Sequence, residues 1–351
     1  MRQLDREAPG LPGLEALSRQ LLRQESVGSS RIERLAIGQR RLARAAAGIG
    51  RDETASQIAG NVAAMERAIA LAAEPRPLTR DDVLAIHRTL FADTRDAPLG
   101  GVVREEQNWI GGSAFSPAGA EFVPPPPEYV GELLDDLVAF LDRDDLPVTL
   151  QAAIAHAQFE TIHPFADGNG RTGRCLIHVV NRRRGLAVNV VPPVSLVLAT
   201  HSGEYVGGLT EYRYGDPVRW LLFFAAATVK AVDRAHKLAR RIEALRDAWL
   251  ERLGQPRRDA STRTLAEQLA AEPILSVARA AQLAGVSDTA AARAVAALEA
   301  AGILRLASKQ AWGRRWEAPE VFALLDAFER DLATPEDAPR PVRPVPRGAD
   351  R

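Results

Sequence analysis

Residues 163–174 read His-Pro-Phe-Ala-Asp-Gly-Asn-Gly-Arg-Thr-Gly-Arg and gather groups that can bind a polyphosphate and move a proton. The imidazole of His163 titrates near neutral pH, which suits a general base. Asp167 supplies the carboxylate oxygen that Mg²⁺ prefers. A Gly-Asn-Gly turn can point several backbone N–H groups at one anion, and two arginines three residues apart can face the same way. The stretch therefore predicts a polyphosphate–Mg²⁺ site with a base at its edge.

Taken singly, these residues have ordinary explanations. A lone loop histidine is usually only that, and Asp-Gly alone is a common turn. The combination favours a site. No Lys-Ser or Lys-Thr pair follows the glycines, so the stretch is not a Walker-type phosphate loop. Two neighbours are interpreted as packing residues, Cys175 just past the motif and His156 two turns before His163.

Helices on both sides are expected to position the motif. One is predicted over 148–162, directly before His163, and another over 171–184, ending at Gly185. Alanine and leucine are abundant and β-branched runs are few, so the fold class is mainly α. Further helices are predicted over 127–141, 205–214 and 217–248.

The N-terminal segment also has a helical pattern. One helix is expected from Leu14 to Gln24, and a turn at residues 27–30 then leads into a second over 31–47. Ser29 or Ser30 would cap the second helix, with Glu33 in the capping-box position. Later helices are predicted over 55–73 and, after Pro75 and Pro77, over 81–91 with Thr79 as N-cap.

Residues 98–130 have a different character. Leu99–Arg104 and Gln107–Gly112 are interpreted as short extended pieces of a small hairpin. The four prolines at 124–127 cannot donate N–H groups to a sheet and should run extended. A long loop of this kind is usually functional or disordered, and Trp109 and Ile110 argue against disorder.

A helix-turn-helix pattern lies in the C-terminal part, with helices over 276–284 and 288–301 around Gly285. Residues 304–306 and 315–317 are expected to form a wing with Lys309, Arg314 and Arg315 near it. A last helix is predicted over 321–332. The proline-rich tail from Thr334 is expected to be disordered.

Composition sets broad limits on function. The chain has 351 residues, 45 basic and 45 acidic, so no overall field attracts nucleic acid or membrane. Its single cysteine cannot form an intrachain disulfide, and no long apolar run or signal-like start is found. We expect a cytoplasmic protein without membrane association.

The motif His-x-Phe-x-Asp-Gly-Asn-Gly-Arg-x-x-Arg, preceded by Phe-Glu-Thr-Ile, resembles the active-site signature of the Fic (Fido) family. The resemblance covers roughly residues 80–225 and implies a Fic-type helical core with a small β-hairpin flap, plus the winged helix-turn-helix domain. It implies a protein adenylyltransferase that moves AMP from ATP, with Mg²⁺, to a Ser, Thr or Tyr hydroxyl of a protein, and releases pyrophosphate. The related Doc kinases have Lys at the position of Gly170, so phosphotransfer is disfavoured.

The resemblance also assigns roles. His163 would be the base, and Asp167 the Mg²⁺ ligand. Residues of the motif that would bind the nucleotide are Asp167, Gly168, Asn169, Gly170, Arg171, Thr172, Gly173 and Arg174. Outside the motif, the flap residues Asn108, Trp109, Ile110 and Gly111 would border the nucleotide and align the target, and Tyr205 would lie near the adenine.

Ser29 to Glu33 resembles the inhibitory helix of the family, whose pattern is Ser/Thr-x-x-x-Glu-Gly/Asn. The resemblance implies that Glu33 pairs with Arg174 and displaces the outer phosphate of ATP. Arg34 stands where the family has Gly or Asn. The alternative interpretation is a simple capping box at Ser29 or Ser30.

The predicted organisation is an N-terminal helical region (1–75), a catalytic domain (76–232), a linking helix (233–260), a winged helix-turn-helix domain (261–333) and a tail (334–351). Several alternatives stay open. The winged helix could bind DNA, dock a protein or assemble a homodimer, and the same site could transfer UMP or phosphocholine or remove AMP. The protein target could be the chain itself.

Overall fold

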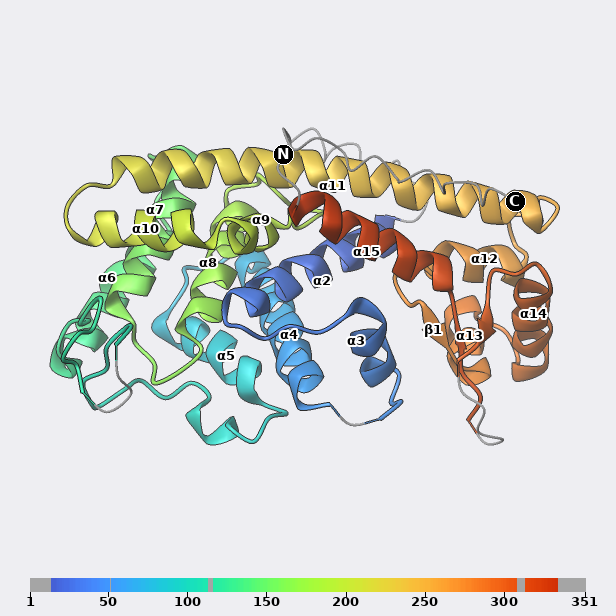
Figure 1. The fold of residues 1–351 in the computed structure, drawn as a ribbon, viewed down its shortest axis with the longest axis horizontal. Helices are drawn as coiled ribbons and strands as arrows, with labels where there is room; N and C mark the ends of the chain where they lie inside the picture. The colour runs from blue at the N-terminus through green and yellow to red at the C-terminus, as the bar shows by residue number, and fades with distance from the viewer. Residues whose placement is uncertain (1–13, 51, 113–115, 308–312, 334–351) are drawn as a thin grey trace, which may run out of the picture.

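The computed structural model describes residues 14–50, 52–112, 116–307 and 313–333. The predicted mainly α fold class is confirmed (Figure 1). The N-terminal and catalytic helices are α2 (Leu14–Ile32), α3 (Gln39–Ala46), α4 (Glu53–Ala73), α5 (Arg80–Phe91), η2 (Ala97–Leu99), α6 (Pro127–Leu141), α7 (Val148–Ile162), α8 (Asn169–Arg183), α9 (Val194–Thr200), α10 (Ser202–Arg213) and α11 (Val218–Arg252). The C-terminal elements are α12 (Ser261–Gln268), β1 (Ile274–Leu275), α13 (Val277–Ala284), α14 (Asp288–Ala300), β2 (Arg305–Leu306), β3 (Trp316–Glu317) and α15 (Pro319–Ala333).

Helix α8 lies at the centre of the catalytic part and packs against α7, α4, α5 and α2. Small residues on α7, such as Ala152 and Ala155, are fully buried and let the two helices approach closely. The predicted helix over 171–184 begins two residues earlier, at Asn169, because Gly168 takes a left-handed conformation (φ 77°) and serves as the N-cap. The motif asparagine and second glycine therefore belong to the first turn of α8.

The predicted turn at residues 27–30 is wrong, because α2 runs unbroken from Leu14 to Ile32. Gly28 serves close packing there, since a Cβ on it would lie 2.4 Å from the backbone nitrogen of Leu196 in α9. The hydroxyls of Ser29 and Ser30 accept hydrogen bonds from Arg174 and Asn61, which replaces the expected helix capping. The capping-box interpretation of Glu33 is wrong for the same reason.

Helix α2 ends in a Schellman motif. The N–H of Arg34 donates to the carbonyl of Arg31, and that of Leu35 donates to the carbonyl of Ser30, both at 3.0 Å. Arg34 is left-handed, with φ 62°. Glu33 is therefore the C-cap residue, directly after the last residue of α2, Ile32.

The flap region is mostly irregular. Ile110 pairs with Phe122 in an isolated antiparallel bridge, not with the 99–104 segment as predicted. The N–H of Ile110 donates to the carbonyl of Phe122 at 2.9 Å, and the N–H of Glu121 donates to Ile110 at 2.8 Å. The backbone of 101–104 instead turns toward the motif, where the N–H of Arg104 donates to the carbonyl of Pro164.

The C-terminal part has the predicted helix-turn-helix, with Gly285 left-handed at the end of α13 and Ser287 capping α14. The three strands form an antiparallel sheet in the order β1-β3-β2, in which Trp316 faces both Leu275 and Leu306. Lys309 and the tail from residue 334 lie outside the described residues.

Helix α11 joins the two parts. Its 35 residues extend about 52 Å, and Figure 1 shows it running above the catalytic helices and on to the winged helix. It passes the predicted boundary at residue 232 without a break. Helix α15 returns to pack on α3, α9 and α11. Within the described residues, no helix is both long and apolar enough to cross a membrane.

Candidate active site

His163 stands at the break between α7 and α8. Its backbone is left-handed (φ 48°, ψ 61°), a conformation that is costly for a residue with a Cβ. Two side chains of the flap region hold the backbone in this conformation. Arg104 Nε and Asn108 Nδ2 donate to the carbonyl of His163 at 2.9 and 3.3 Å. The strained position turns the imidazole out of α7, toward the start of α8.

Two side-chain amides surround the Nδ1 atom of His163. Asn108 Nδ2 lies at 2.9 Å and Asn169 Nδ2 at 3.2 Å. Both amides also donate to the carbonyl of Phe165, and the Oδ1 of Asn169 accepts from the N–H of Phe165. These contacts fix the amide orientations, so Nδ1 accepts hydrogen bonds and the neutral ring carries its proton on Nε2.

Burial, together with the nearby cations Arg213 and Arg104, lowers the pKa of His163 to about 4, and Glu33 opposes this shift. The ring is therefore neutral at pH 7. A polyphosphate anion bound beside it would raise this pKa toward the range that suits a general base.

The Asp167–Asn169 turn exposes one carboxylate and one helix end. The Asp167 side chain is 60% exposed, and its Oδ1 accepts from the N–H of Gly168 at 2.6 Å. Beyond it, the N–H groups in the first turn of α8 have no partner within the helix. Their partial positive charge makes this helix end a natural anion site.

The two motif arginines have different hydrogen-bond partners. Arg171 NH2 is 3.2 Å from Asp167 Oδ2, and its guanidinium stacks over the ring of Phe91. Arg174 faces α2 and is only 1% exposed, with Nε donating to the Ser29 hydroxyl at 2.9 Å. Both guanidinium groups nevertheless attract the carboxylate of Glu33.

Glu33 contacts Arg174 directly. Arg174 NH2 donates to Glu33 Oε1 at 2.6 Å and to the Ser29 carbonyl at 3.0 Å. Burial would raise the pKa of Glu33, but Arg174, with Arg171 and His163, outweighs burial and lowers it. The chain at the end of α2 therefore places an ionised carboxylate against Arg174.

Tyr205 does not face an open adenine pocket. Its ring is 4% exposed, and its hydroxyl lies 2.9 Å from His156 Nε2 and 3.3 Å from Arg174 NH1. Thr172 is buried, and Gly173 packs against Phe159 of α7. These three predicted nucleotide contacts lie in the interior behind Arg174.

The flap residues after Asn108 border the site less closely. Trp109 and Ile110 are half-buried and Gly111 is exposed. Ile110 forms the bridge to Phe122. Gly111 lies so close to Glu121 that a Cβ on it would clash with the Glu121 side chain. Opposite them, Arg213 lies over the ring of Phe122 at 4.5 Å.

Sequence reasoning missed His87, on α5. Its Nδ1 accepts from the N–H of Gly101 at 2.8 Å, and its Nε2 donates to the carbonyl of Asp167 at 2.9 Å. The ring also stacks on Phe165 at 3.6 Å between centroids. His87 therefore ties the start of the flap to the motif, and burial lowers its pKa to about 4.

Glu160 and Arg104 were also missed. Burial raises the pKa of Glu160 to about 7, with Arg174 opposing it, and its Oε1 has no hydrogen-bond partner among the described residues. Arg104 is buried and donates to backbone carbonyls at Ile162 and His163. Glu160 lies in the Phe-Glu-Thr-Ile stretch directly before the motif, and this position could have marked it as a site residue. No sequence pattern marked Arg104.

Comparisons with known proteins agree with this geometry. A model of the Fic/DOC family matches residues 77–180. Protein adenylyltransferase fic-1 of Caenorhabditis elegans is 33% identical over 168 residues, which are 47% of this chain and 30% of that protein. Protein adenylyltransferase Fic of Aedes aegypti is 32% identical over 160 residues, 44% of this chain and 29% of that protein. The chain thus covers less than a third of these relatives' length.

Solved structures show the same fold. A Fic family protein from Desulfovibrio desulfuricans G20 aligns with a TM-score of 0.54 at 20% identity, covering 86% of this chain and 87% of that one. Fic-1 from C. elegans aligns with a TM-score of 0.56 at 24% identity, covering 68% and 70%. The family model thus matches the part of the chain that holds the motif at 163–174, and the solved structures share the helical fold around it.

Proposed function

We propose that this chain is a protein adenylyltransferase that transfers AMP from ATP to a Ser, Thr or Tyr hydroxyl of a protein, and that Glu33 restrains it. The observation that carries the proposal is the grouping of His163, the start of α8 and Arg171 around one exposed carboxylate, Asp167. The curated relatives fic-1 and Fic are named protein adenylyltransferases and support the same activity.

The donor set fits Mg²⁺. Asp167 is exposed, and no cluster of three or more His, Cys, Asp or Glu ligands is found among the described residues. Mg²⁺ is commonly bound by one or two carboxylates together with substrate phosphates, and a single open carboxylate meets that need. When bound, the ion would neutralise charge on the phosphates.

The chain's own residues would do the rest. The N–H groups at the start of α8 would bind the α-phosphate and stabilise the charge that develops on it. The β- and γ-phosphates would contact Arg171 and, once Glu33 has left, Arg174. The pyrophosphate would leave in line with the attacking hydroxyl, so positioning supplies most of the rate.

His163 would take the hydroxyl proton at Nε2. In the present arrangement that atom carries the proton, because the amides of Asn108 and Asn169 donate to Nδ1. Asn108 belongs to the flap and Asn169 to the start of α8, so the other tautomer needs a flap movement that withdraws the first amide and a turn of the second. We propose that target binding on the flap supplies this movement.

The restraint follows from competition for one guanidinium. Glu33 occupies the Arg174 NH2 group that an outer phosphate would need. A charge-assisted hydrogen bond is worth about 1.5–3 kcal/mol, or roughly 10–100-fold in occupancy. Removing the carboxylate should therefore raise transfer by about tenfold or more.

The test is incubation with α-³²P-ATP and Mg²⁺ in a cell lysate, using wild type, Glu33→Gly and His163→Ala. We expect Glu33→Gly to label proteins more strongly than wild type, and His163→Ala to label none. No labelling by Glu33→Gly, or equal labelling by His163→Ala, would reject the transfer reaction. Equal labelling by wild type and Glu33→Gly would reject only the restraint. The intact mass of a labelled protein distinguishes AMP from UMP or phosphocholine.

A further inference from the structure

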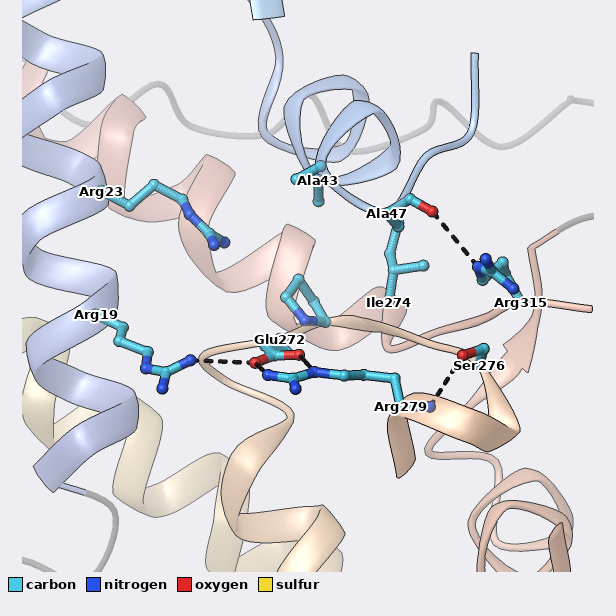
Figure 2. A pocket seen from close by; sticks show the side chains of 11 residues that line it. Arg19, Arg23, Ala43, Ala47, Glu272, Ile274, Ser276, Arg279 and Arg315 are labelled. Carbon is cyan, nitrogen blue, oxygen red and sulfur yellow. Dashed lines mark hydrogen bonds and ion pairs between the residues drawn. The ribbon is translucent and has the colours of Figure 1, made fainter. Parts of the chain in front are cut away.

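A pocket of about 340 Å³ lies between the N-terminal helices and the winged-helix domain, and Figure 2 shows it from close by. It shares no lining residue with the active site. Helix α2 forms one wall, α3 the upper side and the segment around β1 and α13 the floor. Ligand pockets commonly measure about 300–1,000 Å³, so this volume suits a small molecule.

The pocket carries an excess of positive charge. Four arginines line it against a single acidic residue, Glu272, an excess of three positive charges. Glu272 is already shared, since Arg19 donates to it at 3.1 Å and Arg279 at 2.7 Å. Glu272 thus forms ion pairs with two of the four guanidinium groups, and Arg19 also pairs with Glu15 at 2.6 Å.

Those other two, Arg23 and Arg315, have no carboxylate within ion-pair distance among the described residues, although Glu272 and Glu66 attract Arg23 from further away. Arg23 NH1 makes only a long contact of 3.4 Å with the carbonyl of Ala271. Arg315 donates to the carbonyls of Ala47 and Gly313. Figure 2 shows the two side chains entering from opposite sides of the pocket.

The surroundings leave these cations under-compensated. Burial lowers the pKa of Arg23, so its charge is held in a poorly solvated place. Small side chains of α3, Ala43 and Ala47, line the space between the two arginines. The N-terminus of α13, capped by Ser276, also borders the pocket and favours negative charge.

We propose that this pocket binds a small phosphate compound that bridges α2 and the winged-helix domain. Guanidinium groups match phosphate oxygens in two-point contacts, and Arg is the usual residue for such recognition. An anion here would bind Arg23 from α2 and Arg315 from the winged helix at once. It would also relieve the repulsion among the four guanidinium groups.

Ligand binding in this pocket would affect the active site through helix α2. The same helix carries Arg23 and, less than two turns later, Ser29, which binds Arg174. Holding α2 more firmly on the winged helix would hold Ser29 and Glu33 more firmly on Arg174. The ligand would therefore strengthen the contact that restrains transfer.

The test is calorimetric titration of the full chain with inorganic diphosphate at constant ionic strength and without Mg²⁺. We expect saturable binding that the double variant Arg23→Gln/Arg315→Gln weakens by about tenfold or more. The double variant Arg240→Gln/Arg257→Gln, which removes the same two charges from exposed positions, should bind like wild type. Separate titrations with inorganic phosphate and AMP show whether the site takes a free ion or an ester.

Hydrogen exchange distinguishes lost ligand binding from misfolding of the double variant Arg23→Gln/Arg315→Gln. In wild type, saturating diphosphate should increase the protection of peptides from α2 and α13, and in the double variant it should not. Equal diphosphate binding by wild type and the double variant, no measurable binding by wild type, or unchanged protection of α2 would each overturn the proposal. Neither readout needs AMP transfer, so this site stands or falls independently of the proposed activity.

Discussion

Glu33 and Gly170 occupy adjoining space, and a Cβ on Gly170 would lie only 2.1 Å from Glu33 Oε1. The carboxylate that holds Arg174 occupies space that the second motif glycine leaves open, and a Cβ at this position would make the Glu33 and Arg174 side chains shift. Gly170 thus serves the contact with Glu33 as well as the expected phosphate site.

Gly170→Ala should displace Glu33 and lose its bond to Arg174. We expect it to lower the free energy of unfolding of wild type by about 1–3 kcal/mol. In a Glu33→Gly background the loss should be smaller by at least about 1 kcal/mol, because that bond is already absent and Ala favours the helix. Urea unfolding of the four proteins measures the coupling. The control Gly207→Ala, whose Cβ would meet open space, should change the free energy of unfolding equally in both backgrounds. An equal effect of Gly170→Ala in the two backgrounds would contradict its coupling to Glu33.

Arg34→Gly should tighten the restraint. Arg34 is left-handed at the end of α2, a conformation that costs a non-glycine residue about 1–2 kcal/mol. We expect a higher melting temperature and less AMP transfer. Gln255→Gly relieves similar strain at the exposed end of α11 and should stabilise without changing transfer; a matching fall in transfer would argue against a local effect.

Ser29→Ala should weaken the hold of α2 on Arg174. The variant loses the hydroxyl that accepts from Arg174 Nε but keeps the Glu33 bond, so we expect transfer to rise, by less than in Glu33→Gly. Ser30→Ala is the matched control, because its hydroxyl accepts instead from Asn61. Both should cost about 1 kcal/mol of stability. If both raise labelling by the same amount, the effect is general loosening of the helix.

The protein should lose stability as the pH falls from about 6.5 toward 4. The pKa of His87 is lowered to about 4 by burial, so the unfolded chain binds a proton there in this window while the folded chain does not. Glu160, with a pKa raised to about 7, opposes this trend, because its contribution is lost as the pH rises through 7.

A comparison of variants isolates the histidine. Between pH 7 and pH 5, His87 should account for about 2 kcal/mol of the change in unfolding free energy. His87→Leu should show a correspondingly smaller change, and His236→Leu, on the half-buried side of α11, should keep that of wild type. Urea midpoints at the two pH values measure it, and identical slopes for all three proteins would refute the assignment.

The winged helix should bind duplex DNA only weakly. Arg293 is the one basic residue on α14, and Arg305, Arg263 and Arg279 are already paired with Glu317, Glu267 and Glu272. We expect affinities no tighter than the roughly 10⁻⁴–10⁻⁶ M of non-specific binding, falling steeply with salt. Fluorescence titration with random duplex at two salt concentrations tests this. Tight binding that Arg293→Gln abolishes would instead support a DNA-reading role.

The sequence predicted elements whose signals are local. Helix α7 and the helix-turn-helix follow from apolar periodicity and from Gly285 at a helix end. The break at residues 27–30 was wrong because Gly28 and Ser29 look like turn residues. Their real partners, Leu196 and Arg174, lie more than a hundred residues away, and no local pattern encodes them.

The site shows the same division. The motif predicted which residue types gather around His163, yet it could not predict that Arg174 and Tyr205 point inward. His87 and Arg104 escaped notice because they bind backbone N–H and C=O groups of remote loops. Such bonds depend on where the chain passes and leave no residue pattern of their own.

The unbroken course of α11 has a consequence for how the molecule unfolds. One continuous apolar cluster extends from Leu17 on α2 through Trp220 and Trp249 on α11 to Phe328 on α15. Neither half can melt without uncovering apolar surface of the other. Calorimetry should therefore show a single transition whose calorimetric and van't Hoff enthalpies agree, and a chain cut within α11 should aggregate.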